Sequence, residues 1–582
     1  MIERPARQRE EREPAYGSDV VAETLRGLGL EYISLNPGAS YRGLHDSIVN
    51  YLGNERPQLI LCLHEEHAVA VAHGYAKVTE RPMAVALHSN VGLMHASMAI
   101  YNAFCDRVPL LALGATGPLD AAERRPWIDW IHTAADQAAL VRPFVKWDDQ
   151  PGSPAAAVES LVHAHQLTGA YPCAPVYVCL DASLQEAPLA GEGPALPALE
   201  RFAPPSAVLP GEQEARRVLD LLHAAAHPLV LAGRVGRSEA AWRARVELAE
   251  ALGARVLTDL KAGAAFPSAH PLSGTAPGTF LTREGAALVR DADAILALDW
   301  IDLGGTLRQA FGPEAVTPRI ASCSLDYVLA NGWSKDHFSS APVDVHVSTH
   351  PDLLVQALLA LAGTNRPGWE APAVEPEAAA AEVAGIPMRS LAAALAAALG
   401  DGASCLVRLP LGFDGRDLRV SHPLDYLGQD GGAGLGSGPG MAVGAALALR
   451  GTGRLPVAVL GDGDVLMGGS ALWTAAHYEL PLLVVVANNR SFFNDEVHQE
   501  RMAVQRSRPV ENRWIGQRIA DPEADLAGLA RSLGLVAFGP VVDEAALADA
   551  LATAVHAARG GASVLVDVHV GTRGYPGGPV GS

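Results

Sequence analysis

The sequence predicts an α/β protein of three domains, each built on a doubly wound parallel sheet. Short apolar segments alternate with amphipathic ones along the whole chain, which is typical of parallel sheets covered by helices on both faces. A chain of 582 residues is also too long for a single core. Two stretches rich in proline, glycine and alanine, residues 189–213 and 363–387, are expected to be linkers. We therefore expect domains at residues 15–188, 212–362 and 388–582.

Each predicted domain has its own set of apolar strand segments. The first domain contains EYISLNPG, QLILCLHEE, MAVALHSN, PLLALGAT and APVYVCLD. The second contains PLVLAGRVG, ARVLTDLK, DAILALDW and RIASCSLD, and the third contains SCLVRL, LPVAVLGDGD, LPLLVVVANN and SVLVDVHV. The glycine-rich segment at residues 231–238 lacks the full G-x-G-x-x-G pattern of dinucleotide-binding domains, so we interpret it as a structural turn.

Composition and charge argue against several classes of partner. The net charge of −20 disfavours a nucleic-acid-binding surface, which needs clustered lysine and arginine. No apolar run approaches the roughly 20 residues that span a bilayer, and the mixed-charge N-terminus lacks the apolar segment of a signal peptide. The six cysteines lie far apart without a C-x-x-C pair, so we expect no disulfides. Together these features predict a cytoplasmic protein.

Polar residues follow two successive strands of the third domain. Gly461, Asp462 and Gly463 end the first strand, and Asn488 and Asn489 end the second, with a helical segment between them. A right-handed crossover can put such strands side by side, so that an aspartate carboxylate and an asparagine amide oxygen face one pocket. These oxygen donors suit Mg²⁺ bound together with phosphate groups, and the glycines allow a diphosphate to approach the backbone closely.

This arrangement resembles the motif of thiamine-diphosphate (ThDP) enzymes, in which Gly-Asp-Gly precedes Asn-Asn by about two dozen residues. The resemblance implies a pyrimidine-binding, a middle Rossmann-like and a diphosphate-binding domain, with ThDP and Mg²⁺ as cofactors. It assigns metal binding to Asp462, the side chain of Asn489 and the carbonyl group of Ser491. Asp464 departs from the pattern, because relatives carry a small residue beside the diphosphate; we expect its side chain to point away.

The first domain carries the second half of this resemblance. In LCLHEEHAVAVAHGYAK, a glutamate follows a strand and precedes a helix that contains Gly-Tyr-Ala, as in the superfamily. The register gives Glu65 the role of the carboxylate that binds the aminopyrimidine ring and activates the cofactor. Glu66 is then a solvated residue of the first helical turn. Leu435, in GGAGLGSGPGMAVGAALAL, matches the apolar residue that supports the bent shape of the cofactor.

Within the superfamily, the first domain is most similar to benzoylformate decarboxylases. The likeness rests on LNPGASYRGL, HEEHAVAVAHGYAK, LHSNVGLMHASMAIYNA and RPFVKWDDQP, and SALWTAAHYELP continues it in the third domain. His88 matches the active-site histidine, which could relay protons to the carbonyl carbon or oxygen. The active-site serine of that family is replaced by Ala39, with Ser40 beside it, and its second histidine has no counterpart.

Two other residues follow the pattern of pyruvate-type decarboxylases. His132 stands near the position of a His-His pair in that group, and Asp495 lies at the matching distance after Asn-Asn, with Glu496 next. Asp495 could donate a proton to the reacting carbon, or the Asn-Asp-Glu run could simply cap the following helix. Acetolactate synthases are the main rival group, although neither their glutamine nor an FAD-binding segment is evident.

The resemblance implies a lyase that cleaves or forms a C–C bond next to a carbonyl group. We expect a 2-oxo acid decarboxylase with carboligase activity, acting on a small 2-oxo acid or aldehyde. An acetolactate-synthase-like carboligase or a 2-hydroxyacyl lyase is the alternative, and a ThDP-binding protein without turnover is a third hypothesis that Glu65 disfavours. Because superfamily sites lie at dimer interfaces, we expect a homodimer or homotetramer. The tail at residues 571–582, with Tyr575, is either a free end or a lid.

Overall fold

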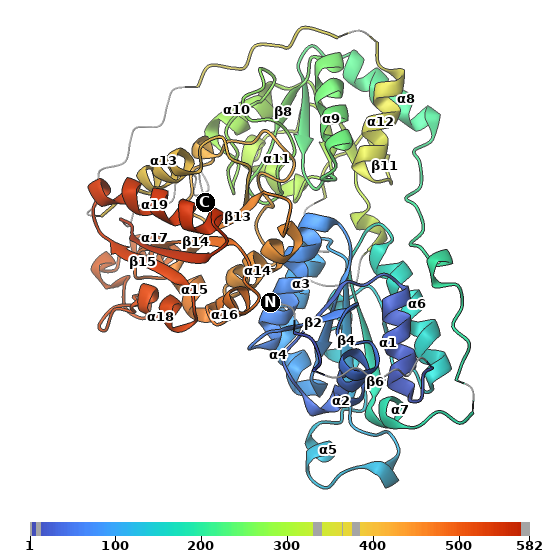
Figure 1. Ribbon diagram of the computed structural model, residues 1–582. Helices are drawn as coiled ribbons and strands as arrows, with labels where there is room; N and C mark the ends of the chain where they lie inside the picture. Colours follow the sequence, from blue (N-terminus) through green and yellow to red (C-terminus); the bar gives the residue numbers. More distant parts are fainter. Residues whose placement is uncertain are drawn as a thin grey trace.

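The computed structural model describes residues 3–6, 13–191, 193–329, 340–363, 365–374 and 385–571. It contains three parallel sheets with helices around them, which follow one another along the chain as the sequence predicts (Figure 1). The tail from residue 572 onward, which includes Tyr575, lies outside the described residues, so the lid stays a hypothesis.

The first sheet has the strand order β2-β1-β3-β4-β6-β5, and its neighbouring strands are parallel. Its strands are β1 (Tyr32–Leu35), β2 (Gln58–Leu61), β3 (Met83–Leu87), β4 (Leu110–Thr116), β5 (Asp148–Asp149) and β6 (Pro175–Asp181). Its helices are α1 (Gly17–Gly27), α2 (Arg42–Asp46), α3 (Glu65–Thr79), α4 (Ser89–Cys105), α5 (Ile128–Ile131), α6 (Pro154–Gly169) and α7 (Ala182–Glu186). Strands β3, β4 and β6 are buried along their whole length, as expected for a sheet covered on both faces.

The second sheet has the order β11-β10-β9-β7-β8 and is also parallel. Its strands are β7 (Pro228–Ala232), β8 (Arg255–Leu257), β9 (Ala294–Leu298), β10 (Arg319–Cys323) and β11 (Val345–Val347). Its helices are α8 (Glu212–His223), α9 (Glu239–Leu252), α10 (Arg283–Asp291), α11 (Leu303–Phe311) and α12 (Pro351–Leu361). The glycine-rich segment at residues 231–238 forms the end of β7 and the turn that leads to α9.

The third sheet has the order β12-β13-β14-β16-β15, again with parallel neighbours. Its strands are β12 (Ser404–Arg408), β13 (Leu455–Gly461), β14 (Leu482–Asn488), β15 (Val536–Val541) and β16 (Ser563–His569). Its helices are α13 (Met388–Leu399), α14 (Ser437–Leu449), α15 (Asp462–Gly468), α16 (Ala471–His477), α17 (Phe493–Gln505), α18 (Leu526–Ser532) and α19 (Glu544–Arg559).

Helices α3 and α14 pack so closely that the first and third domains share one hydrophobic core. A Cβ atom at Gly444 would lie 1.9 Å from the carbonyl oxygen of Val71, so only glycine permits this approach. At the N-terminal end of the pair, a Cβ atom at Gly436 would lie 3.8 Å from Oε1 of Glu66. The start of α3 and the loop before α14 are therefore neighbours within one chain.

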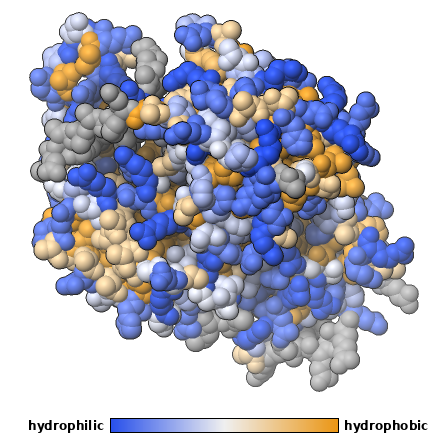
Figure 2. Space-filling view, turned by 90° about the horizontal axis from the view of Figure 1, so that it is seen from above, coloured by the Kyte–Doolittle hydropathy of each residue, from blue (hydrophilic) through white to orange (hydrophobic). Residues whose placement is uncertain are grey.

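The surface drawn in Figure 2 is mostly hydrophilic, with smaller groups of hydrophobic residues between the polar ones. No helix in the described part of the chain is both long and apolar enough to cross a membrane.

Candidate functional site

Four candidate residues of the first domain leave the same edge of its sheet. Ser40 follows β1, Glu65 follows β2, His88 directly follows β3 and His132 lies in the segment after β4. These four parallel strands are neighbours in the sheet, so their carboxyl ends meet at one edge. The strand order therefore gathers residues that are up to 92 positions apart in the sequence (40 to 132).

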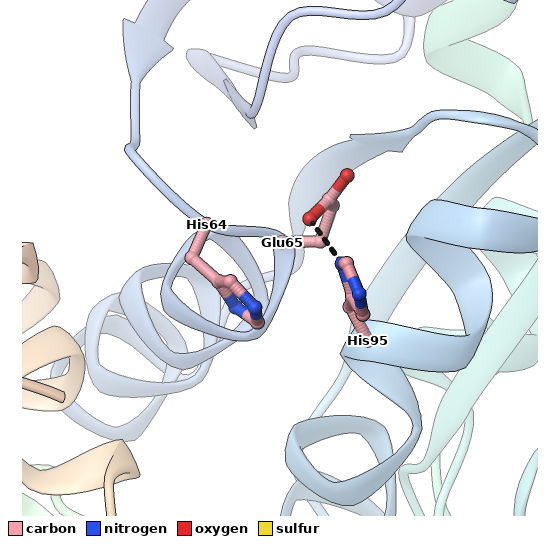
Figure 3. Close-up of side chains that lie close together, drawn as sticks. All are labelled: His64, Glu65 and His95. Atoms are coloured by element: carbon pink, nitrogen blue, oxygen red, sulfur yellow. Dashed lines mark hydrogen bonds and ion pairs between the residues drawn. The ribbon is translucent and has the colours of Figure 1, made fainter. Parts of the chain in front are cut away.

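Glu65 is the first residue of α3, and its side chain is buried. The preceding residue, His64, caps the helix, because its Nδ1 accepts a hydrogen bond of 3.1 Å from the backbone N–H of Glu66. From the neighbouring helix α4, Nδ1 of His95 donates to Oε2 of Glu65 at 3.0 Å (Figure 3). One carboxylate oxygen of Glu65 is thus engaged by a histidine.

Glu66 differs from the expectation that it is solvated, because it is half-buried at the start of α3. Burial raises the pKa of its carboxyl group, and the nearby carboxylate of Asp464 adds to the effect. The physical reason is the close packing of α3 against α14, which places the end of the third domain's glycine-rich loop beside this residue.

His88 is the residue directly before α4, where its side chain makes no capping hydrogen bond, and it forms the centre of a second small cluster. Its Nδ1 lies 2.9 Å from Oγ of Ser40, and its ring contacts that of His132 edge-on at a centroid distance of 4.7 Å. Burial lowers the pKa of His88, and the positive charge that His132 can carry lowers it further, which favours the neutral ring. His132 lies just after α5, in the segment that projects from the first domain at the bottom of Figure 1.

Asp462 and Asn489 follow two strands that lie side by side in the third sheet. In the register of β13 and β14, Gly461 faces Ala487, so both polar residues leave the sheet at one edge. Asp462 is buried, and its Oδ2 has no hydrogen-bond partner among the described residues. Burial raises the pKa of this carboxyl group to about 6, although nearby backbone N–H groups oppose the effect. A buried carboxylate oxygen without a partner is a ready ligand for a cation.

The loop after β14 is held by its own side chains. Oδ1 of Asn489 accepts a hydrogen bond of 3.0 Å from the N–H of Ser491, and Oγ of Ser491 donates to Glu496 at 2.6 Å. Glu496 is buried, whereas Asp495 is exposed in the first turn of α17. Of the two acidic residues after Asn-Asn, the structure therefore brings Glu496 to the loop and leaves Asp495 at the surface. Asn488 donates to Asp567 of β16 at 3.0 Å.

Asp464 is buried and its carboxylate is already engaged. It accepts hydrogen bonds from the N–H groups of Gly436 at 2.7 Å and Gly438 at 3.3 Å, and it lies 3.2 Å from Nε of Arg408. Burial raises its pKa, and Arg408 opposes the shift. The carboxylate thus stabilises the N-terminal end of α14. Leu435, just before this helix, remains 41% exposed.

The two glycines beside Asp462, Gly461 and Gly463, play different parts at the end of β13. A Cβ atom at Gly463 would lie 2.6 Å from the ring of Phe492, so glycine lets the loop after β14 approach. No described atom lies within 4 Å of a Cβ atom built on Gly461, which leaves this side of the strand end open.

Sequence reasoning missed several residues of these clusters. The sequence predicts no role for His64, His95 or Ser40, and it places Glu496 only as the neighbour of Asp495. A signal for His95 was present, because His88 and His95 are seven residues apart, about two turns on one helix face. The contact with Glu65, however, depends on how α3 and α4 pack, which one sequence does not define.

Comparison with protein-family models gives the class of the protein. The N-terminal TPP-binding domain of thiamine pyrophosphate enzymes matches residues 16–140, the central domain matches 215–318, and the C-terminal TPP-binding domain matches 415–568. Thiamine pyrophosphate is another name for ThDP. The chain therefore belongs to the family of ThDP-dependent enzymes.

Individual relatives include decarboxylases and acetolactate synthases. Among the synthases, a "Putative acetolactate synthase large subunit" of Mycobacterium tuberculosis is 25% identical over 538 residues, covering 90% and 93% of the two chains. The chain is 26% identical over 278 residues to a "Probable 2-ketoarginine decarboxylase" of Pseudomonas aeruginosa. The matched region covers 47% of this chain and 46%, about half, of that protein. The chain is also 26% identical over 495 residues to a benzoylformate decarboxylase of the same species, covering 81% and 85% of the two chains. The structure of a ThDP-dependent 4-hydroxybenzoylformate decarboxylase from Rhodococcus jostii has the same fold, with a TM-score of 0.77, 22% identity and coverage of 96% and 100%.

Proposed function

We propose that this protein binds ThDP with Mg²⁺ and decarboxylates a 2-oxo acid, with carboligase activity towards an aldehyde acceptor. The observation that carries the proposal is the buried carboxylate oxygen of Asp462, which has no partner among the described residues and lies at the sheet edge where Asn489 also leaves its strand. Burying such an oxygen is unfavourable on its own, and a bound cation offsets this cost by coordinating it. The family to which the chain belongs supplies the cofactor that such a cation would anchor.

The residues around Asp462 fit a magnesium diphosphate. The Asp462 carboxylate, the Asn489 amide oxygen and the Ser491 carbonyl oxygen would be the ligands, all of them oxygen donors of the kind that Mg²⁺ prefers. The open side of Gly461 leaves room for the diphosphate, and Leu435 would support the bent cofactor. When bound, ThDP would supply a nucleophilic carbon that attacks a carbonyl group and a cationic thiazolium ring that takes up the electron pair released when the adjacent bond breaks.

In this proposal the first domain supplies the proton-handling groups. Glu65 would bind the aminopyrimidine ring through Oε1, since Oε2 accepts from His95. Ser40 would donate to Nδ1 of His88, so that the neutral ring carries its proton on Nε2 and can offer it to a substrate oxygen. His132, in edge contact with His88, would orient this ring and shield it from water. Asp495 remains a candidate proton donor only if a partner subunit covers its exposed position.

The substrate class rests on relatives with low identity. Two of them are described as decarboxylases of 2-oxo acids, one with a guanidinium side chain and one with a phenyl ring. Their side chains differ so much that they support the common 2-oxo acid group and not one particular substrate.

We propose that the active unit is a homodimer, or a tetramer of two dimers, with each site shared between subunits. Exposed apolar side chains flank both half-sites: Leu63, Val91 and Met94 near Glu65, and Leu435, Leu466 and Met467 near Asp462. Such concentrations of apolar surface favour burial against another chain. A second copy would bury them and set Glu65 of one subunit against Asp462 of the other, in addition to the packing of α3 against α14 within each chain. The six free cysteines are consistent with a cytoplasmic compartment, which we include in the proposal.

The test is a panel of 2-oxo acids with the ThDP- and Mg²⁺-loaded protein, with CO₂ release measured with and without an acceptor aldehyde. Release of CO₂ from at least one acid, with the corresponding aldehyde as product, supports the proposal if it disappears in Glu65→Gln. Carboligation of two 2-oxo acids would support the synthase alternative. Cleavage of 2-hydroxyacyl substrates, without CO₂ release from any 2-oxo acid, would support the lyase alternative. A loaded protein inert towards all of these would contradict the proposal.

A further inference from the structure

Helix α4 contacts the Glu65 carboxylate through two residues on one face. At Gly92, a Cβ atom would lie 3.2 Å from both Cγ and Oε1 of Glu65, so any larger residue would push against the carboxylate. His95, three residues later and one turn further along the same face, donates from Nδ1 to Oε2 at 3.0 Å. Within the described part of the chain, His95 is the one side chain that hydrogen-bonds Glu65.

We propose that His95 is a positioning residue for Glu65: it holds Oε2 so that Oε1 is presented to the aminopyrimidine ring of ThDP. This inference rests on the proposed function, because it assumes that Glu65 activates the cofactor. A carboxylate bound at one oxygen loses the freedom to rotate about its terminal bond. The second oxygen then has a fixed direction before the cofactor arrives, which is how outer hydrogen-bond partners tune a reactive group.

A second histidine holds His95 itself in place. The rings of His64 and His95 stack with a centroid distance of 4.8 Å and an interplanar angle of 23° (Figure 3). His64 is fixed in turn, because its Nδ1 accepts from the N–H of Glu66 and its ring also contacts that of His67 at 5.3 Å. The His95 side chain is half exposed, and this stacking limits the rotamers that it would otherwise explore.

The side chains of His64, Glu65 and His95 could also be interpreted as a metal site, since one ligand atom from each lies within 4.8 Å of the others. Two features of the geometry disfavour this. The ring lone pairs lie in the ring planes, and two nearly parallel stacked rings do not aim them at one point. In addition, the lone pair on Nδ1 of His64 already accepts the hydrogen bond that caps α3. The cluster is therefore better suited to fix a carboxylate than to bind an ion.

Three variants test this role. His95→Leu removes the donor, His95→Asn keeps an N–H group close to the position of Nδ1, and His556→Leu changes an exposed histidine of α19 as a control. Two quantities are measured: the Kd of ThDP in the presence of Mg²⁺, by tryptophan fluorescence, and the rate of hydrogen–deuterium exchange at C2 of bound ThDP, by acid quench and NMR. If His95→Leu does not fold, His95→Gln, whose donor lies further out, is compared with His95→Asn.

We expect His95→Leu to bind ThDP with nearly wild-type Kd but to slow C2 exchange by about 10- to 100-fold. His95→Asn should restore most of the rate, and His556→Leu should behave like wild type. If His95 has only a structural role, His95→Leu and His95→Asn should instead lower ThDP binding and thermal stability to the same extent.

Two results would overturn the inference. In the first, His95→Leu exchanges at the wild-type rate while Glu65→Gln is slow, so Glu65 acts without His95. In the second, Zn²⁺ binds tightly to the ThDP-free protein and this binding disappears in His95→Leu, so that the cluster is a metal site. If Glu65→Gln itself exchanges at the wild-type rate, the failure lies with the proposed function and not with His95 alone.

Discussion

Oγ of Ser40 lies 2.9 Å from Nδ1 of His88 and joins the ends of two neighbouring strands, β1 and β3. The same hydroxyl group accepts a hydrogen bond of 3.1 Å from the N–H of Ser89, which fixes its position. Gly38 allows this contact, because a Cβ atom there would lie 2.3 Å from Cβ of His88. Ser40 therefore contacts His88 from the position one residue after Ala39, which the resemblance aligns with the family's active-site serine.

This geometry predicts that His88→Ala lowers turnover by roughly 10²- to 10⁴-fold, the usual effect of removing a positioned proton relay. Ser40→Ala should lower it less, because the ring remains and only its orientation is lost. Both variants should bind ThDP normally, which fluorescence titration can check. If His88 has only a structural role at the end of β3, the melting temperature would fall while turnover per folded site stayed near the wild-type value.

The buried Asp462 predicts that cofactor binding depends on pH. Burial raises the pKa of its carboxyl group to about 6, so the metal-free protein takes up a proton there as the pH falls below that value. Because Mg²⁺ needs the ionised form, the Kd of ThDP measured with Mg²⁺ should rise as the pH falls from 7 to 5. The phosphate groups of ThDP titrate in the same pH range, because the second pKa of a phosphate ester is about 6. Mg²⁺ binding without ThDP, measured over the same pH range, isolates the contribution of Asp462, and a Kd of Mg²⁺ that does not change with pH would contradict the prediction.

A buried ionic cluster predicts a large effect on stability. Asp106 accepts from His73 at 2.8 Å and from Lys77 at 2.7 Å, and Lys77 also reaches the carbonyl oxygen of Gln429 at 2.6 Å. Although burial opposes it, Lys77 and His73 hold the pKa of Asp106 at about 2. Its contribution to stability is therefore present above its unfolded pKa of about 3.9 and is lost as the pH falls towards 2.

Asp106→Ala should destabilise the protein by about 3–5 kcal/mol, because it leaves the Lys77 ammonium group buried without a counter-charge. The measurement is thermal or urea unfolding at pH 7. Asp549→Ala, at an exposed position of α19, serves as the control and should change stability little. An Asp106→Ala variant as stable as this control would show that Lys77 finds another partner or water.

The shared site predicts complementation between two inactive variants. In a mixed dimer of Glu65→Gln and Asp462→Ala chains, one of the two sites would combine intact Glu65 with intact Asp462. Random mixing makes half of the dimers mixed, so about a quarter of wild-type activity should return. A double variant mixed with wild-type chains gives no such site in its mixed dimers. If each chain built its own site, mixing the two single variants would restore nothing.

The fold was largely predictable, because apolar segments at strand length mark the buried strands of a parallel sheet. The three strands that were not predicted, β5, β11 and β15, all lie at the edges of their sheets. Strand β5 consists of two aspartates, and β15 is mostly exposed or half-buried. An edge strand is buried on fewer sides, so its sequence need not be apolar, and pattern alone does not reveal it.

The site was predictable where its residues follow strands and less so where helices meet. Asp462 and Asn489 lie next to each other because β13 and β14 are adjacent, which the crossover rule anticipates. By contrast, the contacts of Glu65 with His95 and of Asp464 with Gly436 depend on helix packing between segments far apart in the chain. Asp464 is predicted to point away from the diphosphate; its carboxylate binds the N–H groups at the N-terminal end of α14, where backbone N–H groups attract a carboxylate.

The central claim is that Glu65 activates ThDP in this protein, and hydrogen–deuterium exchange at C2 of the bound cofactor tests it most directly, without knowledge of the substrate. The measurement uses the protein loaded with ThDP and Mg²⁺, and compares wild type with Glu65→Gln at saturating cofactor. We predict rapid exchange in the wild type and a rate lower by roughly 10²- to 10⁴-fold in Glu65→Gln, with ThDP still bound. Equal exchange rates in the two proteins would contradict this account.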